Sequence, residues 1–317
     1  MSRRLVITLA PAPPSRGTLQ VTGGDFTLLR SGHQTLAITD GVSPVSGCTI
    51  ATSDATKCSV WSGYTVQGNA NSGTCTLTIS KVGYVSTTVT VTCSALNFRM
   101  DAALGTNTTT NAAAVNSWAD QNGGGTFVTG AGTATYATNS MNGQPGITFD
   151  GTASALKDTS QVAALNVATL SVFAIVKPNA AGDGRASART ILNNATSNAG
   201  GIFLRMNSSN FVELLVESGT TQASVDSSPT TYTGGAGQYI TALIANGSQT
   251  LRVGGATVKT GSNVFNASGA PCGIGAVVAG TSSFFYGDID LILASSRIWT
   301  AAEYGQLELM ARDLYAL

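Results

Sequence analysis

The stretch GTCTLTISKVGYVSTTVTVTC, Gly73 to Cys93, alternates apolar and polar residues on both sides of a short interruption at Gly83 and Tyr84. One face of each half carries the apolar side chains, which are Cys75, Leu77 and Ile79 before the interruption and Val89, Val91 and Cys93 after it. A period of two residues is that of a β-strand with one buried face. The stretch therefore predicts a β-hairpin that turns at Gly83 and covers a core.

The pattern of short strands continues outward from this hairpin in both directions. Between residues 18 and 93, runs such as TLQVTG, QTLAITDG and KCSVWSG are separated by glycine, aspartate, asparagine and serine, which favour turns. From Leu96 onward, further apolar runs are spaced like the strands of a two-sheet jelly roll. We predict an all-β protein with an N-terminal arm at 1–17, a β-sandwich at 18–94 and a jelly roll at 95–317.

One α-helix is predicted at the C-terminal end of the chain, in TAAEYGQLELMARDLY, Thr300 to Tyr315. Thr300 precedes Glu303 by three residues, which is the spacing of a capping box. The apolar residues expected to share one helix face are Tyr304, Leu307, Ala311 and Leu314. The pattern predicts an amphipathic helix that packs on the jelly roll and closes it.

The charge balance excludes two classes of partner. The 317 residues include 16 lysines and arginines and 16 aspartates and glutamates, so the formal net charge is zero. Binding to nucleic acid or to an anionic membrane requires a basic surface, which this composition does not supply. No apolar run reaches the roughly 18 residues of a membrane span. We expect no nucleic-acid partner and no membrane insertion.

The N-terminal segment, Met1 to Arg16, begins with two arginines and ends in a proline-rich stretch. Its apolar run, Leu5 to Ala10, is too short for the core of a signal peptide. The segment RLVITLA has the composition of an unpaired strand. We expect an arm that anchors the protein by adding a strand to a neighbouring protein.

Four of the five cysteines fall in the first sandwich. The hairpin register predicts that Cys75 faces Cys93, and the same reasoning places Cys48 opposite Cys58. Each pair is either a cross-strand disulfide or two facing thiols, because both give the same sequence pattern. The spacing contains no Cys-x-x-Cys, so a zinc site is not expected.

Two parts of the chain resemble known families. The phrases TIATSDATKCSVW and GTCTLTISKVGYVSTTVTV are similar to strands of bacterial immunoglobulin-like domains. The order W-x-D-x-x-G-x-G, NGQPGITFDG, TLSVFAIVKP and GDIDLILASSRIWTAAEYGQLELMARDLY resembles the concanavalin A-like lectin/glucanase superfamily, in its laminin-G-like branch. The second resemblance covers Leu96 to Leu317 and implies a jelly roll that ends in a helix.

The segment WADQNGGG, Trp118 to Gly125, contains the first of these motifs and has two interpretations. An aromatic ring beside Asp120 and a run of glycines is what a sugar or calcium site uses. The resemblance instead implies a connection of the first sheet. We then expect Trp118 to pack inward and Asp120 to hold the turn that Gly123 to Gly125 permit.

The residues needed for catalysis do not occur in the required patterns. Glucanases on the resembled fold carry Glu-x-Asp-x-x-Glu, because two carboxylates must flank one glycosidic bond. Here Glu213 and Glu217 would lie about 13 Å apart along one strand, with Leu215 between them. The single imidazole, His33, is expected in an exposed turn and is not part of a nucleophile motif. We expect no enzymatic activity.

No cofactor is expected, although calcium is a minor alternative. Hard cations need several converging oxygen atoms, which could come from Asp120, Asn122, Asp150, Asp288 and Asp290. No Asp-x-Asp-x-Asp-Gly loop occurs. Asp120 and Asp150 are more simply explained as residues that bond the backbone of turns.

Glycan binding is the main functional alternative. Lectins stack aromatic rings on sugar rings beside a few planar hydrogen-bonding groups. Trp118 and Trp299 fall at strand ends within the family motifs and are expected in the core. Trp61 and Tyr64, in VWSGY, are therefore the candidates for an exposed sugar-binding surface.

The combination of the two resemblances is similar to virion proteins of tailed bacteriophages. It implies a non-enzymatic capsid decoration, head-fibre or tail-fibre protein that is assembled in the bacterial cytoplasm and exposed on the particle. The implied partners are other virion proteins of the capsid or tail, a host-surface glycan, and further copies of this chain in a homo-oligomer. The alternative is a carbohydrate-binding surface adhesion module.

Overall fold

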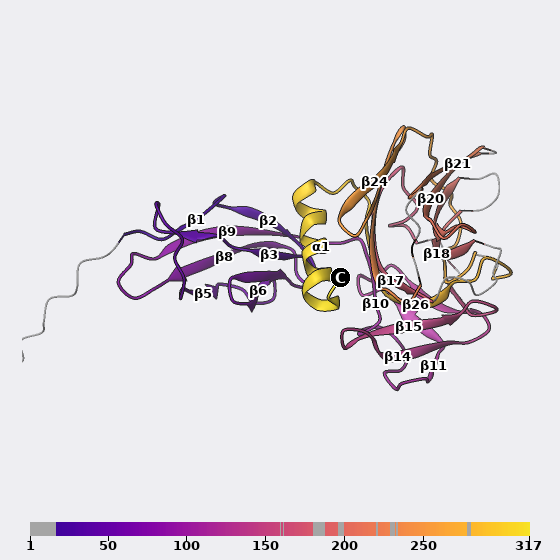
Figure 1. Ribbon diagram of the computed structural model, residues 1–317, viewed down its shortest axis with the longest axis horizontal. Coiled ribbons are helices and arrows are strands. Elements are labelled where there is room, and N and C mark those ends of the chain that lie inside the picture. The colour runs from indigo at the N-terminus through magenta and orange to yellow at the C-terminus, as the bar shows by residue number, and fades with distance from the viewer. Residues whose placement is uncertain are drawn as a thin grey trace, which may run out of the picture. The chain divides into compact units, whose positions relative to one another are not determined.

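A computed structural model of the 317-residue chain describes residues 17–158, 160, 162–179, 188–195, 200–219, 221–228, 232, 234–277 and 280–317. The chain divides into two compact units, Met1–Ala95 and Leu96–Leu317 (Figure 1). The predicted arm lies outside the described residues except for Gly17. Both units are built from β-strands, and the described residues contain one α-helix, so the predicted all-β class is confirmed.

Unit 1 forms two main sheets within residues 17–95. A four-stranded sheet has the order β2-β9-β8-β5, a three-stranded sheet has the order β3-β7-β6, and β1 pairs with β4. The strands are β1 (Gln20–Val21), β2 (Phe26–Leu29), β3 (His33–Thr35), β4 (Ile38–Thr39), β5 (Thr49–Thr52), β6 (Cys58–Ser62), β7 (Thr65–Gly68), β8 (Gly73–Ser80) and β9 (Thr87–Ser94).

The predicted hairpin of Gly73 to Cys93 is confirmed as β8 and β9. Its inward face carries the expected apolar residues, and they are buried in the core of unit 1. One strand was missing from the sequence prediction: β2 pairs with β9 in parallel. Its sequence FTLL buries both Leu28 and Leu29, so it lacks the alternation by which the other strands were recognised.

The predicted register of Cys75 and Cys93 is wrong, although their sulfur atoms lie within 4.8 Å of each other, and the predicted pairing of Cys48 with Cys58 is wrong. In the β8–β9 register Cys75 lies opposite Val91 and Cys93 opposite Gly73, so these cysteines are diagonal neighbours. Cys48 is not opposite Cys58, because the segment between them crosses from one sheet to the other: β5 pairs with β8, whereas β6 pairs with β7. The structure holds all five cysteines in the thiol form.

Unit 2 is a sandwich of two large antiparallel sheets. In the described residues one sheet has the order β11-β14-β15-β26-β17-β22-β23-β24, with β10 also paired to β26, and the other has the order β12-β13-β16-β25-β18-β19-β20-β21. The strands are β10 (Phe98–Asp101), β11 (Ala114–Val115), β12 (Ser117–Ala119), β13 (Thr126–Ala131), β14 (Ala134–Met141), β15 (Gln144–Asp150), β16 (Ala155–Lys157), β17 (Thr169–Pro178), β18 (Arg189–Asn193), β19 (Gly201–Met206), β20 (Val212–Ser218), β21 (Thr221–Asp226), β22 (Gln238–Ala245), β23 (Ser248–Val253), β24 (Ala256–Gly261), β25 (Gly273–Ile274) and β26 (Tyr286–Ser295).

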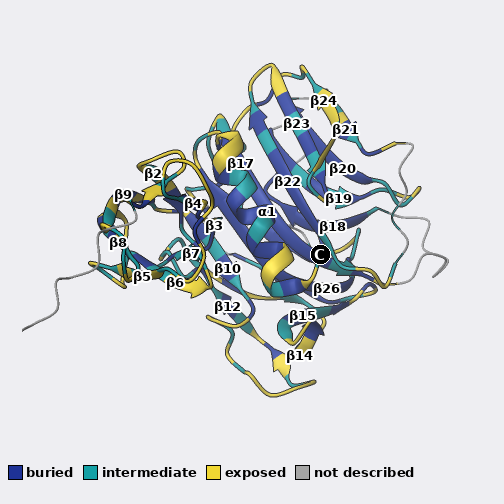
Figure 2. Ribbon diagram, turned by 60° about the vertical axis from the view of Figure 1, so that its left-hand side comes forward, coloured by how far each residue is buried: buried dark blue, intermediate teal, exposed yellow. Residues whose placement is uncertain are grey.

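The core of unit 2 lies between these sheets and is continuous. It joins apolar side chains of both sheets, including edge-to-face aromatic pairs between Phe98 and Phe127 and between Phe149 and Phe285. The central strands are buried along most of their length (Figure 2). Consecutive residues of β17 and β26 are buried, so both faces of these strands are covered.

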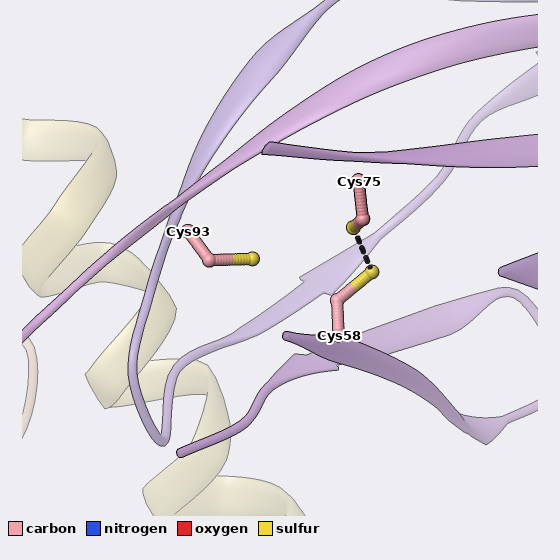
Figure 3. Close-up of side chains that lie close together, drawn as sticks. All are labelled: Cys58, Cys75 and Cys93. Carbon is pink, nitrogen blue, oxygen red and sulfur yellow. Dashed lines mark hydrogen bonds between the residues drawn. The ribbon is translucent and has the colours of Figure 1, made fainter. Parts of the chain in front are cut away.

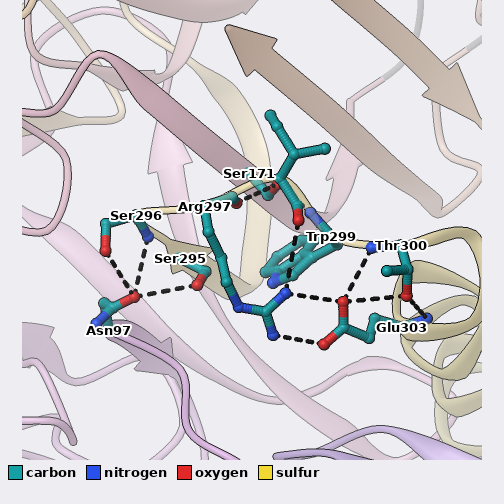
Figure 4. Close-up of polar contacts among 9 residues, drawn as sticks. Asn97, Ser171, Ser295, Ser296, Arg297, Trp299, Thr300 and Glu303 are labelled. Atoms are coloured by element: carbon teal, nitrogen blue, oxygen red, sulfur yellow. Dashed lines mark hydrogen bonds and ion pairs between the residues drawn. The ribbon is translucent and has the colours of Figure 1, made fainter. Parts of the chain in front are cut away.

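The helix α1 (Ala301–Tyr315) follows β26 and packs on β17 and β22. The predicted capping box is confirmed: the Glu303 amide donates to the Thr300 hydroxyl, and the Glu303 carboxylate accepts from the Thr300 amide. Arg297 donates to both carboxylate oxygens of Glu303, which fixes the connection from strand to helix (Figure 4).

The buried face of α1 differs from the predicted one. Tyr304 and Leu314 are only half-buried, whereas Leu307 and Ala311 are fully buried together with Met310 and Tyr315. Polar residues also contribute, since Glu303, Gln306 and Glu308 are buried. No helix in the described part of the chain is long and apolar enough to cross a membrane.

Candidate functional site

The exposed tryptophan of the chain is positioned by an irregularity in β6. The register between β6 and β7 shifts between Val60 and Ser62, so Trp61 is the extra residue of a bulge. Bulges redirect side chains relative to the regular alternation of a strand. The Trp61 ring contacts His33 with ring centroids 5.1 Å apart. In the alternation set by the buried Val66, His33 belongs to the outer face of the sheet, and Trp61 therefore lies there too.

Polar side chains surround this ring. Alternation along β3 and β7 also places Thr35, Thr65 and Gln67 on the outer face, and we call these three residues together with Trp61 the Trp61 face. The hydroxyls of Thr35 and Thr65 lie 2.9 Å apart and form a hydrogen bond. Trp61 is 45% exposed, whereas Trp118 and Trp299 are buried. The Trp61 face thus combines one open aromatic ring with amide and hydroxyl groups.

Tyr64, the other predicted glycan candidate, does not present an open ring. It is half-buried and packs against the core of unit 1. Its hydroxyl accepts a hydrogen bond of 2.9 Å from the backbone amide of Cys48. The tyrosine therefore links two segments of unit 1, and a contact between residues 16 positions apart could not be recognised from the local sequence pattern.

The expectation of an exposed His33 is wrong. The imidazole is completely buried, and the tilted Trp61 ring lies beside it. His33 begins β3 instead of occupying a turn. Its ring packs against the Trp61 ring on the outer face of the sheet.

The segment Trp118 to Gly125 has the structural role expected from the resemblance. The Trp118 ring is buried, and its indole nitrogen donates to the carbonyl oxygen of Asp101 at 3.0 Å. The Asp120 carboxylate accepts from the backbone amides of Arg99, Asn122 and Gly124 at 2.7–2.9 Å. Asp120 therefore closes the turn and ties it to β10.

A surface pocket of about 330 Å³ nevertheless lies against this turn. Its lining includes the polar residues Asn97, Asn122 and Ser296 and the apolar residues Ala163, Ala164 and Val167. The side-chain oxygen of Asn97 accepts from Ser295 and Ser296 (Figure 4). The sequence pointed only to Asn122, because the other residues come from segments far apart in the chain. None of the lining residues that the structure describes is aromatic, so they offer no stacking surface to a sugar ring.

The two strand glutamates do not form a hydrolytic pair. Glu213 makes an ion pair with Arg205 on the neighbouring strand at 2.5 Å. Glu217 is buried and accepts a hydrogen bond from Gln222. Burial raises the pKa of Glu217 above its usual value. Both carboxylates lie on β20 with Leu215 between them, as predicted.

The acidic residues considered for calcium are divided among separate locations. Asp120 holds its turn, and Asp150 accepts from the amides of Thr152, Ala153 and Ser154. Both predicted turn roles are confirmed. Asp288 and Asp290 lie together on β26, where the Ser140 hydroxyl contacts both carboxylates and the Thr148 hydroxyl donates to Asp288.

The geometry of a metal site occurs elsewhere. Among the residues that the structure describes, one group of three or more histidine, cysteine, aspartate or glutamate side chains brings its ligand atoms within metal-binding range. It consists of Cys58, Cys75 and Cys93.

No protein-family model matches the chain. No curated protein matches it either. Among solved structures, it is similar to domain 4 of an extracellular GH43 arabinanase from Geobacillus stearothermophilus in complex with arabinotriose. The identity is 19%, the match covers 58% of this chain and 82% of that one, and the TM-score is 0.43.

Two further structures show a comparable degree of similarity. The botulinum neurotoxin type G receptor binding domain shares 12% identity over 68% of this chain and 51% of its own, with a TM-score of 0.47. The CBM40 domain of the Ruminococcus gnavus IT-sialidase shares 13% identity over 46% of this chain and 83% of its own, with a TM-score of 0.38. At these identities the likeness concerns the β-sandwich fold alone.

Proposed function

We propose that this protein is a non-catalytic carbohydrate-binding module in which the Trp61 face of unit 1 contacts the glycan. The observation that supports the proposal is the exposure of Trp61 on a sheet face beside hydroxyl and amide groups. An indole ring offers a flat apolar surface to the C–H face of a sugar ring. Thr35, Thr65 and Gln67 supply donors and acceptors for its hydroxyl groups.

The charge of the protein favours a neutral glycan. The formal net charge is zero, and the four residues of the Trp61 face carry no charge. An anionic sugar would need a cationic partner, usually an arginine that binds its carboxylate. We therefore expect the module to select neutral sugars by stacking and hydrogen bonding.

A glycan array followed by affinity measurement tests this proposal. The wild-type chain should bind one or more neutral glycans, and Trp61→Ala should weaken the affinity by about 10-fold or more, which corresponds to roughly 1.4 kcal/mol. Val60→Ala is the matched control, because Val60 is the adjacent exposed residue but does not belong to the Trp61 face. Absence of glycan binding by the wild type, or full binding by Trp61→Ala, would overturn the proposal.

The proposal includes the absence of glycosidase activity. Its support is the use of Glu213 in an ion pair and the burial of Glu217. Incubation with β-glucans should release no reducing sugar. Turnover that is lost in both Glu213→Gln and Glu217→Gln would contradict a purely binding role.

A virion role is the second candidate. It is supported by the pairing of two β-sandwich units with separate cores, an arrangement that suits an exposed particle protein. In this role the protein would be assembled in the bacterial cytoplasm, contact capsid or tail proteins, and form a homo-oligomer. Mass spectrometry of purified particles tests it: a high copy number indicates decoration of the capsid, a low one indicates a tail or fibre, and absence excludes the role.

A further inference from the structure

Three buried thiols meet in the core of unit 1. Cys58 lies on β6, Cys75 on β8 and Cys93 on β9, and their sulfur atoms are all within 4.8 Å of one another (Figure 3). The Sγ atoms of Cys58 and Cys75 are 2.7 Å apart. We propose that Cys58 and Cys75 form a disulfide bond that cross-links the two main sheets of unit 1, while Cys93 remains a thiol.

The 2.7 Å separation supports a covalent pair. Even carbon atoms, which are smaller than sulfur, pack at about 3.5–4.0 Å when they are not bonded. A disulfide has an S–S distance of about 2.05 Å. The two sulfur atoms are therefore closer to a bond than to an ordinary packing contact. Little movement of β6 and β8 is needed to form the bond.

A metal site fits the same cluster less well. Two thiolates that share one tetrahedral zinc lie about 3.8 Å apart, as follows from a Zn–S distance of about 2.3 Å. Cys58 and Cys75 would have to separate to reach this distance. Three thiolates would also place negative charge in a core whose other buried members are leucine, isoleucine and valine side chains. A disulfide is neutral and avoids this cost.

The bond would join two sheets that are otherwise held together by packing, by the chain and by polar contacts such as that between Thr52 on β5 and Cys58 on β6. Cys58 belongs to the sheet β3-β7-β6 and Cys75 to the sheet β2-β9-β8-β5. The two residues are separated by 17 positions. Closing such a loop reduces the freedom of the unfolded chain and so stabilises the folded unit.

The reaction requires a disulfide oxidant such as glutathione disulfide. The Cys58 thiolate attacks one sulfur of the oxidant, releases one glutathione thiolate and becomes a mixed disulfide. The Cys75 thiolate then attacks the Cys58 sulfur and releases the second glutathione thiolate. The protein thiols lose two protons and two electrons, and the oxidant is reduced to two glutathione molecules. Since all three cysteines are buried, the exchange takes place while unit 1 folds or opens locally.

The folded environment affects the Cys58 and Cys75 thiols differently. A hydrogen bond from Cys93 lowers the pKa of the Cys58 thiol. Burial raises the pKa of the Cys75 thiol. The thiolate is the reactive form, and these shifts apply to the closed unit; in the opened unit the second cysteine attacks whichever one has formed the mixed disulfide.

Tryptic mapping of the full-length wild-type protein distinguishes the pairings. The protein is refolded in a glutathione redox buffer, and free thiols are then blocked by alkylation. Cys58 and Cys75 share the tryptic peptide 58–81, whereas Cys93 lies in 82–99 and Cys48 in 31–57. We expect peptide 58–81 to lack two hydrogens and to carry no alkyl group. Chymotryptic cleavage after Trp61 should then give two fragments that remain joined.

Other maps would overturn the proposal. A cross-link between peptides 58–81 and 82–99, or between 31–57 and 58–81, would assign a different pair. Alkylation of both cysteines of peptide 58–81 after refolding under oxidising conditions would show that no bond forms. A cadmium–thiolate absorption band that requires all three cysteines would assign a metal site instead.

Thermal unfolding of serine variants provides a second readout. Oxidation should raise the melting temperature of unit 1 by about 10 °C in the wild type and in Cys93→Ser. The rise should be absent in Cys58→Ser and Cys75→Ser. An equal rise in all variants, or its loss in Cys93→Ser, contradicts the assigned pair. The wild-type peptide map decides the question even if a serine variant fails to fold.

Discussion

Asp288 and Asp290 share one hydroxyl group: the Ser140 Oγ atom lies 2.9 Å from a carboxylate oxygen of each. A hydroxyl has one proton and can donate to only one of them. One carboxylate therefore lacks this proton, and the negative charge of Asp288 disfavours ionisation of Asp290. This agrees with the environment of Asp290, because complete burial raises its pKa to about 8.

The raised pKa of Asp290 predicts that stability falls as the pH rises. Asp290 of the unfolded chain loses its proton near pH 3.8, whereas Asp290 of the folded protein keeps it up to about pH 8. The contribution of this residue to the free energy of unfolding is therefore complete below pH 3.8 and is lost as the pH rises to about 8. Asp290→Asn should flatten this dependence and gain a few kcal/mol relative to wild type at pH 9. Urea unfolding at pH 5, 7 and 9, followed by tryptophan fluorescence, measures this pH dependence. The variants are made in a Trp61→Phe background, so that both remaining tryptophans report on unit 2.

Ser140→Ala is the companion variant for this prediction. Hydrogen bonding from Ser140 lowers the pKa of Asp290, against the stronger effect of burial. Its removal should therefore move the loss of stability to higher pH. An unchanged pH dependence in Asp290→Asn would show that another group controls it.

Removal of the Asp120 carboxylate should destabilise unit 2 by about 3 kcal/mol, because three backbone amides lose their acceptor. Asp120→Ala in the Trp61→Phe background is compared with its parent by urea unfolding. Asp120→Asn retains one side-chain oxygen and should lose less. Equal stability of Asp120→Ala and the parent would mean that the turn holds without this residue.

Fluorescence quenching should identify Trp61 as the accessible tryptophan. Trp61 is 45% exposed, whereas Trp118 and Trp299 are at most 2% exposed. Iodide should therefore quench one component of the emission in the folded wild type. Trp61→Phe should abolish this component and Trp299→Phe should retain it. A quenchable component that persists in Trp61→Phe would show that Trp118 or Trp299 is accessible and would contradict their burial.

Loss of the Thr300 hydroxyl should loosen the start of α1. Thr300→Ala removes the acceptor of the Glu303 amide and should cost about 1 kcal/mol. Thr300→Ser keeps the acceptor and should behave like the wild type. Hydrogen exchange by mass spectrometry should show faster exchange confined to the first turn of α1. Unchanged exchange in Thr300→Ala would indicate that Arg297 and Glu303 alone fix the helix end.

Local patterns were sufficient to predict the all-β class, the β8–β9 hairpin and the cap of α1. The strands were recognised from apolar residues at every second position. The helix cap was recognised from the three-residue spacing of Thr300 and Glu303. The turn roles of Asp120 and Asp150 were predictable for the same reason. In both residues the carboxylate accepts hydrogen bonds from backbone amides a few residues away.

Contacts between distant segments could not be predicted in this way. Cys48 and Cys58 looked like a hairpin pair, but their strands belong to different sheets. The bulge that turns Trp61 outward depends on the partner strand β7, and the sequence of β6 does not encode it alone. The Tyr64 hydroxyl accepts a hydrogen bond from the Cys48 backbone amide, and this contact also depends on the tertiary arrangement.

The position of β26 within the larger sheet of unit 2 determines when this unit can fold during synthesis. This strand precedes only the helix in the chain, yet it pairs with β10, β15 and β17 and so lies at the centre of the sheet. On the ribosome, unit 1 is finished at Ala95 and can fold while the rest is being translated. The earlier strands of unit 2 cannot form the complete sheet until residues 286–295 leave the exit tunnel, and their apolar faces stay uncovered until then. A message truncated before this point yields a folded first unit attached to an open, aggregation-prone second one.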